Sequence, residues 1–369
     1  MTHVNLIRHC REQSGLSQAE LGDRVGVTRQ TIAAWEREDR EPSVAQLAKI
    51  AQTLGVSVEL LLQTSRPATE TFEPGLMFRA DDPSALNPYL RATLSQKAAD
   101  YAFVETLVQE VPTLPALRPL QGYNDYIVEE VAREIRDWLG VGEACPLGDV
   151  LALLESKGLK AILHPLPPEI SGFSAYTETD GATIFINESH PTERKFFTAL
   201  HELAHLVFHR QEYRISVEIK AHLRFNKSKR SDPSEKAANH FAGAVLLPED
   251  VIRRELHAYR DRWLPEPLLM DIKRRYGVSL RTVLYRARQA KLITIKQKGQ
   301  QIGILNKKYG ADNEPVTLPQ PEHLTRLERM VYLALRQGKI TISRAAEILG
   351  KPLIKVRESL NAWLEEAEA

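Results

Sequence analysis

The segment His201-Glu202-Leu203-Ala204-His205 constrains the fold of this chain more than any other feature of its sequence. Apolar residues flank it at helical spacing, so we expect the segment to be part of an amphipathic helix. In a helix, positions i and i+4 lie one above the other on the same face. Both imidazole rings can therefore reach one metal ion. The alternative is that both histidines are ordinary residues of a helix without a metal.

Two glutamates suggest what such a metal site would do. Glu202 follows the first histidine and can face a water molecule at the metal, as the proton-accepting carboxylate of metalloproteases does. A catalytic zinc site uses three protein ligands and one open position. Residues 234–248 predict a second helix that starts after Asp232-Pro233, and Glu235 in its first turn would complete a His-His-Glu set. Alternatively, Glu235 is a solvated carboxylate at the positive end of that helix.

Five motifs follow one another in this region: Ser171 to Ser174, Ile184 to Asn187, Arg194 to Leu206, Glu235-x-x-Ala238-Asn239-x-Phe241-Ala242, and Leu246-Leu247-Pro248. In type and order they resemble the motifs of the ImmA/IrrE family of metallopeptidases. The resemblance covers roughly Ala132 to Ile293, and it departs from the family pattern at Ala204, where the family usually has glycine. It implies a zincin-like peptidase domain that cleaves phage-type or stress repressors.

The resemblance also implies roles for individual residues. His201, His205 and Glu235 would bind zinc, and Glu202 would be the catalytic base. Manganese is the other candidate metal, because two histidines and one glutamate suit both ions. His209 extends the histidine face by one turn, and we expect it to be a partner of a ligand or a surface residue. His222 and His240 could each polarise a reaction intermediate, and the spacing does not choose between them.

Residues 4–62 carry a second pattern, which predicts five short helices. Ser17 and Glu20 can form a capping box at the start of the second helix, and Thr28 can cap the third. The tight turn between these helices predicts a helix-turn-helix domain. Four motifs stand out in this segment: Leu16-Ser17-Gln18-x-x-Leu21-Gly22, Val27-Thr28-x-x-x-Ile32-x-x-Trp35-Glu36, Arg40-x-Pro42, and Leu54-Gly55-Val56. Together they resemble the Xre/lambda-repressor-like family.

This second resemblance implies contacts with a double-stranded DNA operator. Gln18 would touch a phosphate, and Thr28, Arg29, Gln30 and Thr31 would project into the major groove. Arginine can bind guanine with two hydrogen bonds, and glutamine can do the same with adenine. Alternatively, Arg29 and Gln30 are only exposed helix surface. The segment has seven basic and eight acidic residues, so we expect specific binding to require a homodimer.

Composition narrows the class of protein further. Only two cysteines occur in 369 residues, which excludes a disulfide framework and fits a cytoplasmic protein. The chain has no apolar run of membrane-spanning length, and its first residues lack the pattern of a signal peptide. The formal net charge is +1, but residues 253–308 hold fifteen basic and four acidic residues. These charges are either solvated helix faces or a surface for nucleic acid or an acidic partner.

The remaining segments predict a mainly helical α+β protein with a small sheet. We expect helices over residues 92–109, 125–139, 147–157, 324–335, 341–350 and 354–364, and strands over 161–164, 293–297 and 301–305. Residues 174–177 and 183–186 flank Asp180-Gly181, which predicts a hairpin. This hairpin is either a plain structural element or the sheet edge that pairs with a substrate peptide. The last two helices resemble a second, smaller helix-turn-helix and suggest a packing or dimerisation element.

These features predict four regions. They are a helix-turn-helix domain at 1–65, a linker and helical arm at 66–124, a metallopeptidase domain at 125–293, and a small C-terminal helical region at 294–369. The expected function is a DNA-binding transcriptional regulator whose zinc endopeptidase cleaves a repressor or antitoxin-like protein in a stress, phage or mobile-element response. Two alternatives are a transcription factor whose peptidase-like domain is an inactive sensor or dimer scaffold, and an autoregulating toxin–antitoxin component.

Overall fold

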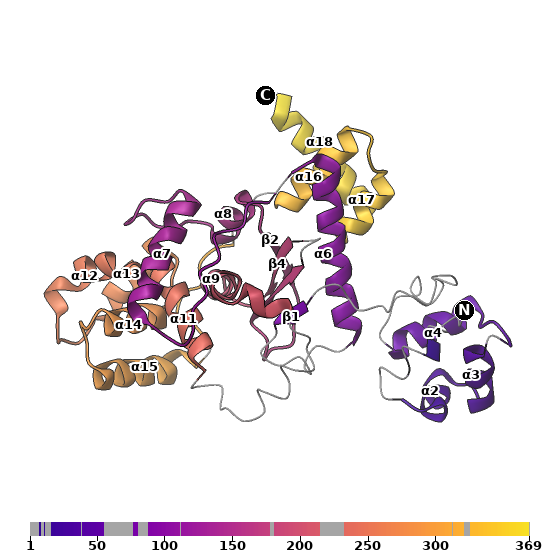
Figure 1. Cartoon of the computed structure of the whole chain (residues 1–369), viewed down its shortest axis with the longest axis horizontal. Helices are drawn as coiled ribbons and strands as arrows, with labels where there is room; N and C mark the ends of the chain where they lie inside the picture. The colour runs from indigo at the N-terminus through magenta and orange to yellow at the C-terminus, as the bar shows by residue number, and fades with distance from the viewer. Residues whose placement is uncertain are drawn as a thin grey trace. The chain divides into compact units, whose positions relative to one another are not determined.

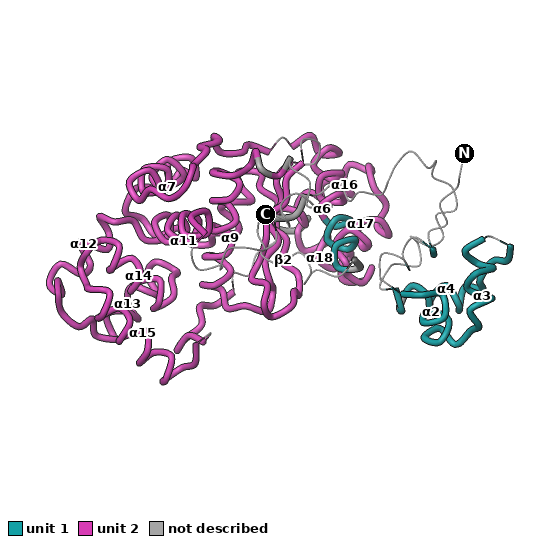
Figure 2. The backbone as a smooth tube through the Cα atoms, turned by 60° about the horizontal axis from the view of Figure 1, so that its bottom comes forward, with its two compact units in different colours: residues 1–76, 82–97 teal, residues 77–81, 98–369 magenta. Residues whose placement is uncertain are grey.

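The computed structural model describes residues 7–8, 11, 16–37, 39–54, 77–79, 88–110, 112–177, 181–214, 232–311, 313–320 and 325–368. The chain forms two compact units, which Figure 2 distinguishes by colour. Residues 1–76 and 82–97 belong to the first unit, and residues 77–81 and 98–369 belong to the second. The mainly helical α+β class expected from the sequence is confirmed, with helices dominating and one small sheet in the second unit (Figure 1).

The first unit contains helices α2 (Gln18–Val25), α3 (Arg29–Glu36) and α4 (Val44–Leu54). Their apolar faces share one core, in which Leu21, Ile32 and Ile50 are completely buried and Trp35 is 2% exposed. Ile7, Arg8 and Arg11 are also helical, in agreement with the first predicted helix. The predicted fifth helix, over residues 56–62, lies outside the described residues.

Local sequence signals set the turn between α2 and α3. Ser17 and Glu20 form the predicted capping box, and the Thr28 hydroxyl accepts a hydrogen bond from the Thr31 backbone at the start of α3. Gly26 ends α2 with a φ of 80°, a left-handed conformation that favours glycine. A Cβ atom added at Gly22 would lie 2.7 Å from the Val27 carbonyl oxygen. Glycine at this position therefore allows the two helices to approach closely.

The second unit is built around a four-stranded sheet with the order β1-β3-β4-β2. The strands are β1 (Met77–Arg79), β2 (Lys160–His164), β3 (Gly172–Thr177) and β4 (Gly181–Asn187). β3 and β4 form the predicted antiparallel hairpin, and β2 pairs with β4 in parallel.

This hairpin does not lie at the outer edge of the sheet in the structure. The outer side of β3 pairs with β1, and β4 pairs with β2 on its other side. The strand that covers β3 comes from a proline-containing segment in which the sequence indicated only a linker.

Three helices stack in succession on the sheet and form the main core with it. α9 (Thr192–Phe208) packs against β3 and β4, and α11 (Pro233–Leu246) lies between α9 and α7 (Asp125–Leu139), as Figure 1 shows. Small residues of α11, including Ala237, Ala238 and Ala242, are completely buried and allow this close packing. The segment with the two histidines is therefore held rigidly against the sheet on one side and against a second helix on the other.

Four more helices and a short 3-10 segment extend this unit beyond α11. They are α12 (Glu249–Leu256), η4 (His257–Tyr259), α13 (Glu266–Tyr276), α14 (Leu280–Gln289) and α15 (Ile295–Tyr309). The predicted strands at 293–297 and 301–305 were wrong, because this stretch is α15. Thr294 and Gln297 form a capping box that starts the helix, and Gln301 and Leu305, one turn apart, are its buried residues. The β-branched residues of the stretch suggested strands, but the cap and the helical spacing determine the structure.

Several of the positive charges in residues 253–308 form ion pairs within the second unit. Arg275 binds Glu255 and Asp271, Arg281 binds Glu314, and Lys308 binds Glu266. Lys273 and Arg286 are buried and pair with Glu193 and Glu129. These pairs favour the interpretation of the basic segment as helix faces over a surface for nucleic acid or an acidic partner, although the buried Lys273 and Arg286 are not solvated as that interpretation expected.

Helices from both ends of the second unit meet beside the sheet. α6 (Pro88–Val108), which belongs to this unit from residue 98 on, and α8 (Val150–Ser156) precede β2, while α16 (Arg326–Arg336), α17 (Ile342–Leu349) and α18 (Leu353–Glu368) come last. Glu105 on α6 accepts from Arg326 on α16 at 2.5 Å and forms an ion pair with Lys160 on β2 at 3.0 Å. All three residues are 5% exposed or less. This buried cluster fixes α6 and α16 to the sheet.

Candidate metal centre and DNA-contact helix

Two helices of the second unit bring the candidate metal ligands together. His201 and His205 lie one turn apart on α9, and Glu235 lies in the first turn of α11. The Nε2 atoms of the histidines are 3.1 Å apart, and Glu235 oxygens lie 3.2 Å from His201 Nε2 and 3.4 Å from His205 Nε2. Among the described residues, these three form the group of histidine, cysteine and acidic side chains that could hold a metal ion.

The start of α11 explains the position of Glu235. Asp232 caps the helix by accepting a hydrogen bond from the Ser234 backbone, and Pro233 occupies the first helical position. Close packing of α11 against α9 then directs the first turn of α11 toward the two histidines. The cap and the proline at the start of α11, both visible in the sequence, therefore position Glu235 beside the two histidines.

The spacing of the three side chains can be compared with that required by zinc. Around a tetrahedral zinc ion with bonds of about 2.0–2.2 Å, neighbouring ligand atoms lie roughly 3.3–3.6 Å apart. The two Nε2 atoms are 3.1 Å apart, and one Glu235 oxygen lies 3.2 Å from His201 Nε2 while the other lies 3.4 Å from His205 Nε2, which is close to this spacing. The donor set thus fits a small divalent ion and leaves a fourth direction for another ligand.

The electrostatics of Glu235 suit a metal ligand. Burial alone would raise the pKa of this carboxyl, but hydrogen bonds from His201 and His205 outweigh that effect and hold the pKa well below its usual range. Glu235 is therefore ionised at neutral pH and presents a negative charge to the site. Its side chain is 21% exposed, whereas that of His205 is 3% exposed.

Glu202 is held by two residues whose contribution the sequence did not indicate. The Ser174 hydroxyl donates to Glu202 Oε2 at 2.6 Å and lies 2.7 Å from the Tyr213 hydroxyl. Ser174 belongs to β3, and Tyr213 belongs to the short 3-10 segment η2 (Arg210–Arg214). The only sequence signal was a serine within a strand that is otherwise suited to burial, because a buried hydroxyl requires a partner. These contacts fix the orientation of the Glu202 carboxylate.

The other histidines near the site have different surroundings. His209 Nδ1 lies 3.3 Å from His205 Nδ1, and His209 is only 3% exposed, so it is a buried neighbour of a candidate ligand. The alternative prediction of a surface residue was wrong. His240 contacts the Tyr123 hydroxyl at 2.9 Å and Glu129 at 2.7 Å. His222 lies outside the described residues.

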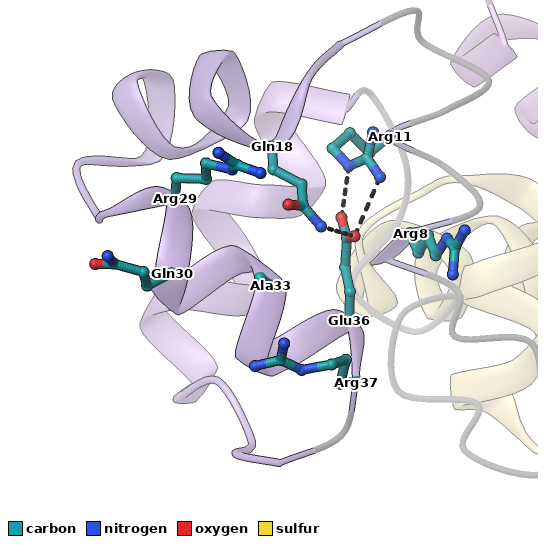
Figure 3. A pocket seen from close by; sticks show the side chains of 8 residues that line it. All are labelled: Arg8, Arg11, Gln18, Arg29, Gln30, Ala33, Glu36 and Arg37. Atoms are coloured by element: carbon teal, nitrogen blue, oxygen red, sulfur yellow. Dashed lines mark hydrogen bonds and ion pairs between the residues drawn. The ribbon is translucent and has the colours of Figure 1, made fainter.

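The first unit presents a second candidate site on α3. Thr28, Arg29 and Gln30 are exposed at the start of this helix, and Thr31 is half-buried. Gln18 is also half-buried, and its amide nitrogen donates to Glu36 at 2.7 Å. Glu36 in turn accepts from Arg11 at 2.5 and 3.1 Å, so one buried carboxylate joins three segments (Figure 3). These bonds fix the start of α2 against α3.

The surface beside this network is hollowed and mainly basic. In Figure 3, Gln30 extends away from α3 and the Arg29 side chain runs toward Gln18. The residues that line the hollow are Arg8, Arg11, Gln18, Arg29, Gln30, Ala33, Glu36 and Arg37. Four arginines and one acidic residue give this face a local positive charge, although the segment as a whole has none. Such a face is suited to phosphate groups.

Comparisons with known proteins assign both units. Residues 7–61 match the family described as Helix-turn-helix, and residues 154–288 match the family described as IrrE N-terminal-like domain. An uncharacterized HTH-type transcriptional regulator of Methanothermobacter thermautotrophicus is 52% identical over 50 residues, which are 14% of this chain and 72% of that protein. The chain belongs to the helix-turn-helix transcriptional regulators. It also carries an IrrE-like peptidase-family domain.

Two further comparisons involve regulators. The uncharacterized HTH-type transcriptional regulator YgzD of Bacillus subtilis is 42% identical over 55 residues, which are 15% of this chain and 83% of that protein. A solved structure of a Mycobacterium tuberculosis transcriptional regulator aligns with 51% of each chain at 17% identity and a TM-score of 0.31. The helix-turn-helix family implies DNA binding by the first unit. No helix in the described part of this regulator is long and apolar enough to cross a membrane.

A half-buried acidic group in the second unit of the regulator predicts a pH-dependent stability. Burial opposes ionisation of Glu129, but hydrogen bonds from His240 and Arg286 lower the pKa of this carboxyl from 4.5 to about 2. Because the folded-state pKa is depressed, the stabilisation is complete above about pH 4.5 and is lost as the pH falls toward 2. A shift of this size corresponds to roughly 3 kcal/mol. We expect wild type to lose about this much more stability than Glu129→Gln over that interval.

Urea unfolding of both proteins between pH 2.5 and 6 would measure this difference. Glu130→Gln is the matched control, because Glu130 is the exposed neighbour of Glu129 on α7. Stability curves that stay parallel for wild type and Glu129→Gln would contradict the assigned role of Glu129.

Proposed function

We propose that this regulator binds an operator as a dimer and cleaves a protein substrate at a zinc centre formed by His201, His205 and Glu235. The single observation that carries this proposal is the convergence of three ligand atoms within 4.8 Å of one another, next to the buried carboxylate of Glu202. The substrate we propose is a transcriptional repressor or an antitoxin-like protein in a stress, phage or mobile-element response. We place this activity in the cytoplasm, where operator DNA is accessible, and keep manganese as the alternative metal.

The residues of the site suggest how peptide hydrolysis would proceed. A bound zinc ion would supply Lewis acidity, which favours deprotonation of water and stabilises negative charge on the substrate oxygen. Glu202 would accept a proton from the attacking water and deliver it to the leaving amine as the peptide bond breaks. The products would be a new carboxylate and a new amine.

The surroundings of Glu202 support its role as base. Ser174 and Tyr213 form a chain of hydrogen bonds that orients the carboxylate. Burial at 5% exposure strengthens its electrostatic interaction with a nearby cation. The side chain of His205 is 3% exposed, while those of His201 and Glu235 are 15% and 21% exposed.

Comparison of protein fragments would test the proposed peptidase. Wild type and Glu202→Gln would be produced separately in the same host, and new protein N-termini would be identified by mass spectrometry. We expect new N-termini from a repressor or antitoxin-like protein only with wild type. Identical sets of N-termini from the two strains would contradict the peptidase assignment and favour a sensor or scaffold role.

For the DNA-binding unit, we expect Arg29→Ala to weaken operator binding by about 5- to 150-fold. Loss of one bidentate hydrogen bond between an arginine and a base costs roughly 1–3 kcal/mol of binding free energy. Lys49→Ala is the control, because it removes one exposed positive charge from α4 instead of α3. Fluorescence anisotropy with an operator selected from a genomic DNA library would measure both variants at one salt concentration. Equal losses for the two variants would show that Arg29 contributes only charge.

A further inference from the structure

A short strand of the chain covers the outer side of β3, next to the candidate peptidase site. Residues 77–79 form β1, which pairs antiparallel with β3. The register places residue 77 opposite Tyr176, residue 78 opposite Ala175, and residue 79 opposite Ser174. Ser174 is the residue whose hydroxyl donates to Glu202. The backbone of residue 79 is therefore the direct partner of the strand position that orients the candidate base.

The surroundings of β1 make this edge suitable for peptide binding. Extended peptides commonly bind proteins by adding a strand to a sheet edge, where main-chain hydrogen bonds supply affinity. β3 provides such an edge and packs against α9, the helix that carries His201, Glu202 and His205. The η2 segment, which contains Tyr213, contacts both β1 and β3. An extended segment on this edge would thus lie beside the group that orients Glu202.

We propose that residues 77–79 occupy the peptide-binding edge of this site, and that a protein substrate pairs with β3 only after β1 leaves. This inference rests on the proposed peptidase function, because it describes how the same site binds its substrate. The partner that fits the edge is an extended polypeptide segment that runs antiparallel to β3. β1 would then compete with the substrate for pairing with β3, and it has the advantage of being covalently attached.

The length and attachment of β1 determine how strong this competition is. A strand of three residues forms few main-chain hydrogen bonds, so its pairing is weak in itself. Covalent attachment compensates, because a tethered segment has an effective concentration that can reach the millimolar range. A free peptide at micromolar concentration should therefore bind poorly to wild type and well to a chain in which β1 cannot pair.

The test uses full-length, zinc-loaded protein with Glu202→Gln, so that binding is measured without cleavage. Backbone N–H groups of adjacent strand residues point in opposite directions. Replacing both Met77 and Phe78 with proline removes at least one donor that faces β3, whichever set of alternate residues supplies the donors. Replacing both with alanine is the matched control, because alanine retains both donors.

The probe is a fluorescent peptide with the sequence of residues 74–82, followed by anisotropy. We expect it to bind the double-proline variant on the order of 10-fold more tightly than wild type or the double-alanine control. A peptide with prolines at the same two positions should not bind. Equally weak binding to all three proteins would overturn the proposal.

A second measurement applies to the chain with an unaltered β1 and does not depend on the folding of the proline variant. Millimolar peptide, with norleucine in place of methionine so that its mass differs, should accelerate hydrogen exchange at residues 77–79. No acceleration at saturating peptide would overturn the proposal. Neither readout requires catalysis, so peptide binding without substrate cleavage would contradict only the proposed peptidase function.

Discussion

Glu202→Gln is expected to reduce substrate cleavage by about 10²- to 10⁴-fold without loss of bound zinc. Glutamine has nearly the same shape as glutamate and can still accept a hydrogen bond from Ser174, but it cannot accept the proton of the attacking water. The three candidate ligands are unchanged in this variant. The turnover number and the metal content of the same preparation would measure both parts of the prediction.

Asp250→Asn is the control for the removal of one negative charge from this unit. Asp250 is exposed in the first turn of α12, so this variant should cleave at the wild-type rate. A Glu202→Gln protein that cleaves as fast as wild type would remove Glu202 from the mechanism. Loss of zinc from that variant would instead show that Glu202 supports the metal site.

The second large effect concerns the metal itself. We expect about one zinc ion per chain in wild type and essentially none in His205→Ala, because a set of three ligands would lose one member from its buried side. Zinc binds only the folded site, so free zinc at about 1,000 times the dissociation constant should stabilise this unit by roughly 4 kcal/mol. A chelator should therefore lower the melting temperature of wild type and leave that of His205→Ala unchanged.

His257→Ala is the matched control, because His257 is an exposed histidine of the same unit. It should retain the metal and the response to the chelator. Elemental analysis would also distinguish zinc from manganese. Wild type that stays free of metal after incubation with zinc would contradict the proposed centre, and the chain would then be a DNA-binding regulator with an inactive peptidase-like domain.

The parts of the fold that depend on local signals could be predicted from the sequence. The predicted helix over residues 125–139 has the observed bounds of α7, because Asn124 caps its start and Gly140 ends it with a φ of 77°. The capping box of α2 and the cap of α3 also lie where the sequence indicated. Each of these features is determined by residues within a few positions of one another.

Features that depend on distant residues could not be predicted in this way. β1 has only three residues and exists through its pairing with a strand about 100 positions later in the chain. The contacts that orient Glu202 join β3, α9 and η2, and no motif marks Ser174 and Tyr213 as partners. The convergence of His201, His205 and Glu235 was expected because the two-histidine motif and the cap of α11 are both local signals. The packing of α11 against α9 provides the rest.

The buried cluster of Glu105, Lys160 and Arg326 has a consequence for how such proteins can diversify by domain shuffling. These three charges come from α6, β2 and α16, and Glu105 is the shared partner, so exchange of α6 would break both buried ion pairs and exchange of β2 or α16 would break one of them. Breaking a buried ion pair in this way costs roughly 3–5 kcal/mol. Recombination that replaces the helices after residue 325 would therefore need compensating changes at Glu105. The C-terminal helices and the peptidase-family sheet are expected to be inherited as one evolutionary module.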